Sequence, residues 1–146
     1  MGRGEKIMAK DMLSKVGSWA FLIGILIALI VGLYQATTLE GEMMGATGFF
    51  GESTGGWVAW ILAVIGAIVG VLAVLGKGTI TAKETPGFLL AGIALVVMGG
   101  VFSGWHAIIT PWIGALLEGV SFSLSIFVAP AVGILAIKAV WDMGKD

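Results

Sequence analysis

Residues 16–36 read VGSWAFLIGILIALIVGLYQA, an apolar run without a charged side chain. At about 1.5 Å of rise per residue, a helix over this run is about 30 Å long, which matches the hydrocarbon core of a bilayer. Three further apolar runs follow at 57–75, 88–105 and 122–140. The sequence therefore predicts an all-α membrane protein with four transmembrane helices in a single membrane domain, 1–146.

The composition agrees with this class. Apolar side chains make up 58% of the chain and charged ones 12%, and the mean hydropathy is +1.06, values far from soluble-protein usage. With a net charge of −1 and no basic stripe, we expect the lipid bilayer as a partner and no nucleic acid. Cysteine is absent, which excludes disulfides and thiolate metal ligands.

Basic residues predict the orientation, because short loops rich in Lys and Arg stay on the cytoplasmic side. All eight fall on one side of the predicted spans: Arg3, Lys6, Lys10, Lys15, Lys77, Lys83, Lys138 and Lys145. The opposite connections have acidic residues and no basic ones: Glu40, Glu42, Glu52 and Glu118. We therefore expect a multi-pass protein of the cell (plasma) membrane with both termini cytoplasmic.

The first span has one competing interpretation. A basic segment precedes residues 16–36, as in a cleaved signal peptide. The apolar run is longer than the usual core of a signal peptide, which favours a retained span.

The two connections opposite the basic residues carry different expectations. Residues 37–56 are acidic and glycine-rich, and we expect a loop on the membrane surface, or else a subunit contact or the lining of a vestibule. In the second connection, Thr110 and Pro111 fit an N-cap and a first helical residue. A helix entering there would pass Glu118 into the fourth span. The alternative is a separate outer interfacial helix near 111–119.

Small residues recur every fourth position in the first span: Ala20, Gly24, Ala28, Gly32 and Ala36. The second span carries two such rows: Ala59, Ala63 and Ala67 in one, and Gly66 and Gly70 in the other. Lipid tails are as apolar as leucine, so membrane helices associate through the close backbone approach that small residues allow. These rows are predicted helix-packing faces, within one bundle or between copies. With 24 glycines in the chain, we expect a homo-oligomer.

His106 and Glu118 are the only titratable side chains between the third and fourth spans. A helical hairpin there would bring them together as a candidate polar site for proton or metal chemistry. One histidine and one carboxylate are too few for a metal site, and at the interface we expect each to be solvated. No catalytic residue, metal site or cofactor is predicted, because nucleophile–base pairs, ligand clusters and phosphate loops are missing from the sequence. We do not expect an enzyme.

Five short runs carry a resemblance: TAKET at 81–85, GFLLA at 87–91, IAL at 93–95, FVAPA at 127–131 and AIKAV at 136–140. Together they resemble a group of small multi-span membrane proteins of archaea and some bacteria. The resemblance implies a prokaryotic membrane origin, and it assigns neither a function nor site residues.

Packing faces are present in this sequence and chemical motifs are absent from it, so we expect a structural or scaffolding membrane protein that self-associates. Two alternatives remain open. One is a channel or passive pore subunit, in which the acidic connection gathers cations. The other is an accessory subunit of a larger membrane complex.

Overall fold

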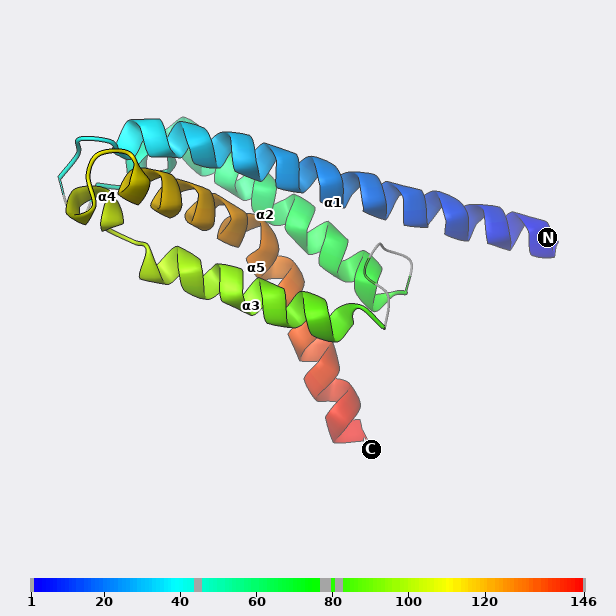
Figure 1. Ribbon diagram of the computed structural model, residues 1–146. Coiled ribbons are helices and arrows are strands. Elements are labelled where there is room, and N and C mark those ends of the chain that lie inside the picture. The colour runs from blue at the N-terminus through cyan, green and yellow to red at the C-terminus, as the bar shows by residue number, and fades with distance from the viewer. Residues whose placement is uncertain (1, 44–45, 77–79, 81–82, 146) are drawn as a thin grey trace.

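The computed structural model describes residues 2–43, 46–76, 80 and 83–145, and the described parts are helices and connections without a strand. Figure 1 shows the elements in chain order, with η1 a short 3-10 helix. Their bounds are α1 Arg3–Leu39, η1 Gly48–Gly51, α2 Ser53–Val74, α3 Thr85–Val101, α4 Trp105–Ile108 and α5 Ile113–Lys145.

Three helices are long and apolar enough to cross a membrane: Lys15–Leu39 within α1, Ser53–Val74 and Ile113–Lys145. Helix α3 is a shorter apolar helix. The outward face of α1 is apolar, since Leu22, Leu26 and Ile30 are each more than half exposed. Large apolar side chains facing outward in rows are typical of a lipid-facing surface. The prediction of an all-helical, multi-pass membrane protein therefore fits these helices.

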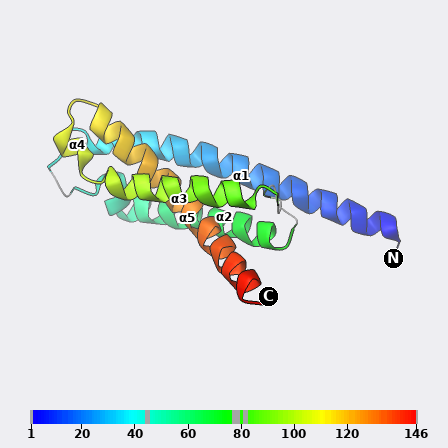
Figure 2. The ribbon, with the colours of Figure 1, turned by 60° about the horizontal axis from the view of Figure 1, so that its bottom comes forward.

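Helix α5 is the centre of the assembly. It packs against α1, α2 and α3, while α1 and α2 also contact each other (Figures 1 and 2). Its side chains Phe127, Val132 and Leu135 are buried together with Leu62 and Val69 of α2. Pro130 lies inside α5, where it removes one helical hydrogen bond. The C-terminal end of α5 points away from the other helices (Figures 1 and 2).

The small-residue row of α1 faces α5. Ala20 is half-buried and the other four members are buried. A Cβ atom built on Gly32 would lie 2.8 Å from the Cα atom of Val120, closer than real Cβ contacts. One turn away, the Ser123 hydroxyl donates to the carbonyl oxygen of Ala28 at 2.7 Å. Small side chains thus let the α1 and α5 backbones touch.

The rows of α2 lie differently. Gly66 packs against the Phe127 carbonyl and Gly70 against the backbone of Ala131, so the glycine row also serves contact with α5. The alanine row, Ala59, Ala63 and Ala67, is half-buried. Gly24 and Gly32 of α1 and Gly66 and Gly70 of α2 therefore all pack against α5 within one bundle.

The region before the last helix differs in part from expectation. Helix α5 runs without a break from Ile113 to Lys145, so the helix that passes Glu118 into the fourth apolar run is present and a separate helix at 111–119 is not. The bond between Thr110 and Pro111 is cis, and both residues precede the helix instead of opening it. Helix α3 ends at Val101, four residues short of the predicted span, because Gly104 with φ +84° turns the chain into α4.

Candidate functional site

Several elements converge at the α4 end of the bundle: the last turns of α1, the η1 segment, the end of α3, α4 and the first turns of α5. Two close contacts place α5 there. Gly114 lies against the backbone of Trp105 in α4, and a Cβ atom on Gly119 would lie 2.5 Å from the carbonyl oxygen of Gly32. The start of α5 is therefore held from both sides, and the Glu118 side chain with it.

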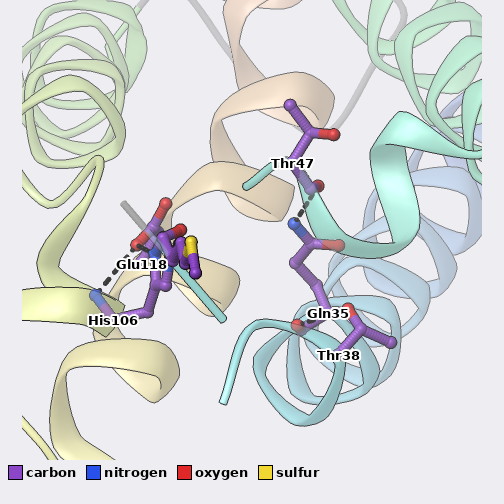
Figure 3. Close-up of polar contacts among 6 residues, drawn as sticks. Gln35, Thr38, Thr47, His106 and Glu118 are labelled. Atoms are coloured by element: carbon purple, nitrogen blue, oxygen red, sulfur yellow. Dashed lines mark hydrogen bonds and ion pairs between the residues drawn. The ribbon is translucent and has the colours of Figure 1, made fainter. Parts of the chain in front are cut away.

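His106 and Glu118 form a buried pair (Figure 3). The Nδ1 atom of His106 lies 2.6 Å from Oε2 of Glu118, and the backbone N–H of His106 donates to the same oxygen at 3.1 Å. His106 is 1% exposed and Glu118 is 9% exposed, which excludes most bulk water from the contact. A single carboxylate oxygen thereby ties α4 to α5.

The second ring nitrogen of His106 fixes the number of protons on the pair. Nε2 lies 3.0 Å from the carbonyl oxygen of Met43, and a carbonyl oxygen only accepts hydrogen bonds. Nε2 therefore carries a hydrogen, and the short contact between Nδ1 and the carboxylate holds one more proton between them. Without that proton, two lone pairs would face each other at 2.6 Å.

The surroundings shift the pKa of His106 upward. Burial of the ring lowers this pKa, but the hydrogen bond to the Met43 carbonyl, the hydrogen bond and charge of Glu118, and the charge of Glu42 together raise it above its ordinary value. The charged form of the imidazole is thus favoured at this end of the bundle.

Gln35 organises the other wall. Its side chain is 3% exposed, and its Nε2 donates to the carbonyl oxygen of Thr47 at 2.9 Å (Figure 3). Its Oε1 accepts from the backbone N–H of Phe50 at 3.1 Å. The Thr38 hydroxyl accepts from the N–H of Phe49 at 2.9 Å. These bonds fasten η1 and the residue before it onto α1.

A cavity of about 210 Å³ lies between the two walls. Its polar lining includes Gln35, Thr47, Ser103 and Glu118, and its aromatic lining is Phe50 and Phe122. The two phenyl rings meet edge to face with centroids 5.5 Å apart. Among the residues that the structure describes, no donor engages the Oε1 atom of Glu118, so one oxygen of this carboxylate is left for the cavity.

Metal binding by protein groups alone has little support in the described part of the chain. No group of three or more His, Cys, Asp or Glu side chains lies close enough there to share an ion. The chemistry available to the site is therefore hydrogen bonding, the charges and the proton of the His106–Glu118 pair, and contact with two aromatic side chains.

Sequence reasoning found part of this site. The expected proximity of His106 and Glu118 is observed, whereas the expected solvation of both is wrong, because α4 folds over Glu118 and buries the pair. Gln35 was missed. One feature of the sequence could have indicated it: Gln35 is the only glutamine in the chain, and it lies at the end of an apolar run. Thr47 and Phe50, from the connection at 37–56, line the cavity.

Comparison with known proteins adds no assignment. No family model, no curated protein and no solved structure matches the chain.

Proposed function

We propose that this multi-pass membrane protein binds a small solute in the cavity at the α4 end of the bundle. One observation carries the proposal: the Oε1 atom of Glu118 is left unengaged at a cavity wall while Oε2 is held by His106. Ionisable side chains buried among membrane helices are costly to keep and commonly mark sites of function.

The size of the cavity limits the solute. At about 210 Å³ it lies below the range of about 300–1,000 Å³ that accepts drug-sized ligands. Its lining includes polar side chains, so water or a small polar molecule can occupy it.

The topology proposed with this function has four spans and both termini in the cytoplasm. Helix α3 has 17 residues and spans about 25 Å, short of a hydrocarbon core of about 30 Å, so the membrane would have to thin slightly around it. The one-sided distribution of basic residues supports the orientation. The cavity would then open toward the outer face.

Thermal unfolding in detergent micelles tests the binding function. We would add a panel of small amines, alcohols and carboxylates to the wild type, to Glu118→Gln and to the matched control Glu52→Gln, whose carboxylate is exposed. A ligand at a hundred times its Kd stabilises the folded state by about 2.7 kcal/mol. We expect such stabilisation in the wild type and the control, and its loss in Glu118→Gln.

Failure of every solute to stabilise the wild type would contradict the binding function. Equal stabilisation of the wild type and Glu118→Gln would place binding elsewhere on the protein.

A second candidate function is structural, by self-association. The glycine rows of α1 and α2 lie against α5, but α3 exposes three small residues at helical spacing, Gly87, Ala91 and Ala94. A helix face of this kind allows close approach of a second helix. A pore would likewise need several copies, because α5 fills the centre of one bundle.

Cross-linking in native membranes that yields only monomers would contradict self-association, and recovery of other chains would favour an accessory subunit.

A further inference from the structure

We propose that the solute of this cavity is a small organic cation and that it competes with the proton held by the His106–Glu118 pair. This inference rests on the proposed binding function and names its ligand class and its regulation.

Charge and aromatic surface both favour a cation. The Oε1 atom of Glu118 supplies a negative charge, and the rings of Phe50 and Phe122 supply aromatic surface, whose electron-rich faces attract positive groups. None of the described residues that line the cavity is Lys or Arg, so a carboxylate or phosphate ligand would find no positive partner among them.

The cation is organic and not a bare metal ion. Calcium is held by six to eight oxygen ligands, carboxylates among them, and the described lining of this cavity offers a single carboxylate. The lining of the cavity suits an alkylammonium ion instead. It offers one acceptor for the N–H groups of the ion and apolar surface for its carbon chain. A volume of about 210 Å³ fits a chain of a few carbons.

Competition with the proton follows from the charges. One carboxylate neutralises one cation, and the protonated His106 ring already occupies Oε2 at 2.6 Å. An ammonium at Oε1 would lie about 5 Å from the imidazolium, and Coulomb repulsion at an effective dielectric constant of about 20 would weaken its binding by roughly a hundredfold. Binding is therefore tighter when the pair has released its proton to water.

The other charged groups around His106 are few. Glu42, after α1, acts on the ring through its charge, and Glu40 accepts from the N–H of Trp112 at 3.1 Å. Helices α2 and α3 contain no titratable side chain. The neutral ring retains one N–H, which can donate to Glu118 or to Met43 but not to both. Cation binding thus also weakens one of the two contacts of His106.

The experiment uses three probes of similar size: propylammonium, 1-propanol and propionate. Their binding to the full-length protein in detergent micelles is followed by tryptophan fluorescence, since Trp105 adjoins His106 in the chain. Titrations are made between about pH 6 and pH 8, where a histidine changes charge. Calorimetry in two buffers of different ionisation enthalpy counts the protons released on binding.

We expect propylammonium to bind at least tenfold more tightly than 1-propanol, and propionate not to bind. Below the pKa of His106, the apparent Kd for propylammonium should rise about tenfold for each unit of pH lost, up to roughly a hundredfold. Near neutral pH, about one proton should leave per cation bound. His106→Gln should remove the pH dependence, and Glu118→Gln should remove the preference for the cation, whereas Glu52→Gln should behave as the wild type.

Each contrary result has a distinct meaning. Equal binding of propylammonium and 1-propanol would overturn the cation assignment and leave the binding function standing. Cation binding by the wild type without pH dependence or proton release would overturn the competition, and this measurement needs no variant that folds poorly. Absence of binding by all three probes would overturn the cation assignment, and absence across the wider solute panel would overturn the binding function itself.

Discussion

Glu118 uses its two carboxylate oxygens for different contacts. Oε2 accepts from the backbone N–H and from the ring of His106, which ties α4 to α5. Oε1 has no donor among the described residues, and Glu118 is one of the residues that line the cavity. The side chain that ties α4 to α5 is therefore also the one at which we propose ligand binding, and we expect a change in the protonation of His106 to affect both the tie and the binding.

Raising the pH should destabilise the fold through His106. Its folded pKa lies above its ordinary value of about 6.5, so the stabilisation is complete below the unfolded pKa and is lost as the pH rises through the folded pKa. We expect the thermal unfolding temperature in detergent to fall over that interval. In His106→Gln the decrease should be absent, while Glu52→Gln should retain it. An identical pH profile in the wild type and His106→Gln would contradict the role of this ring.

Replacing Gln35 by Leu should loosen the wall of the cavity. The substitution leaves the N–H of Phe50 and the carbonyl oxygen of Thr47 without their side-chain partner. Both hydrogen bonds are partly buried, and a bond of this kind contributes about 0.5–1.5 kcal/mol, so we expect the free energy of unfolding to fall by about 1 kcal/mol or more. Denaturant titration measures this, with the exposed Thr37→Val as the control. A wild-type value for Gln35→Leu would show that the loop needs no such anchor.

At the scale of the helices, contact with α5 depends on the absence of side chains. A Cβ atom on Gly119 would lie 2.5 Å from the Gly32 carbonyl oxygen and 2.8 Å from the Ala36 nitrogen, both of them backbone atoms. Backbone atoms cannot rotate aside as a side chain can. The whole helix would have to move.

Gly119→Ala should therefore destabilise the bundle. Overpacking of this kind costs about 1–3 kcal/mol, because α1 and α5 must separate. Gly133→Ala is the matched control, since it lies on the same helix and a Cβ atom there meets nothing within 4 Å. We expect the control to be neutral or slightly stabilised, as for glycine replaced in an open helical position. Equal unfolding free energies for the two variants would refute the close packing of α1 on α5.

The sequence predicted the helices well and their ends less well. Apolar runs locate the part of a helix that lies in lipid, but α2 begins at Ser53, four residues before its predicted span, because helical hydrogen bonding continues into the interface. The continuous helix through Glu118 was one of two alternatives. Its start at Ile113 was not predicted, since Trp112 adopts φ +70°, a conformation that sequence patterns rarely indicate.

The site was less predictable than the helices for a physical reason. His106 and Glu118 are twelve positions apart, and their contact depends on the single turn of α4, which has no periodic pattern of its own. Gln35 reaches Thr47 and Phe50 across a connection whose path local propensity does not determine. Such contacts follow from tertiary packing, which one sequence does not reveal.

At the scale of the molecule, the orientation in the membrane is testable because the chain has no cysteine. Single cysteines are introduced at the exposed positions Ser53 and Gly144. An impermeant maleimide should label Ser53→Cys in intact cells and Gly144→Cys only after permeabilisation, as expected for termini in the cytoplasm. The reverse pattern at both positions would refute the proposed topology.

The central position of α5 has a consequence for biosynthesis. A ribosome makes α1, α2 and α3 first, and each packs mainly or partly on the helix that is made last. Until residues 113–145 are inserted, the glycines of α1 and α2 that pack on α5 lack that contact, and His106 lacks the carboxylate of Glu118. We therefore expect the bundle and its polar site to be completed together when the final helix is inserted.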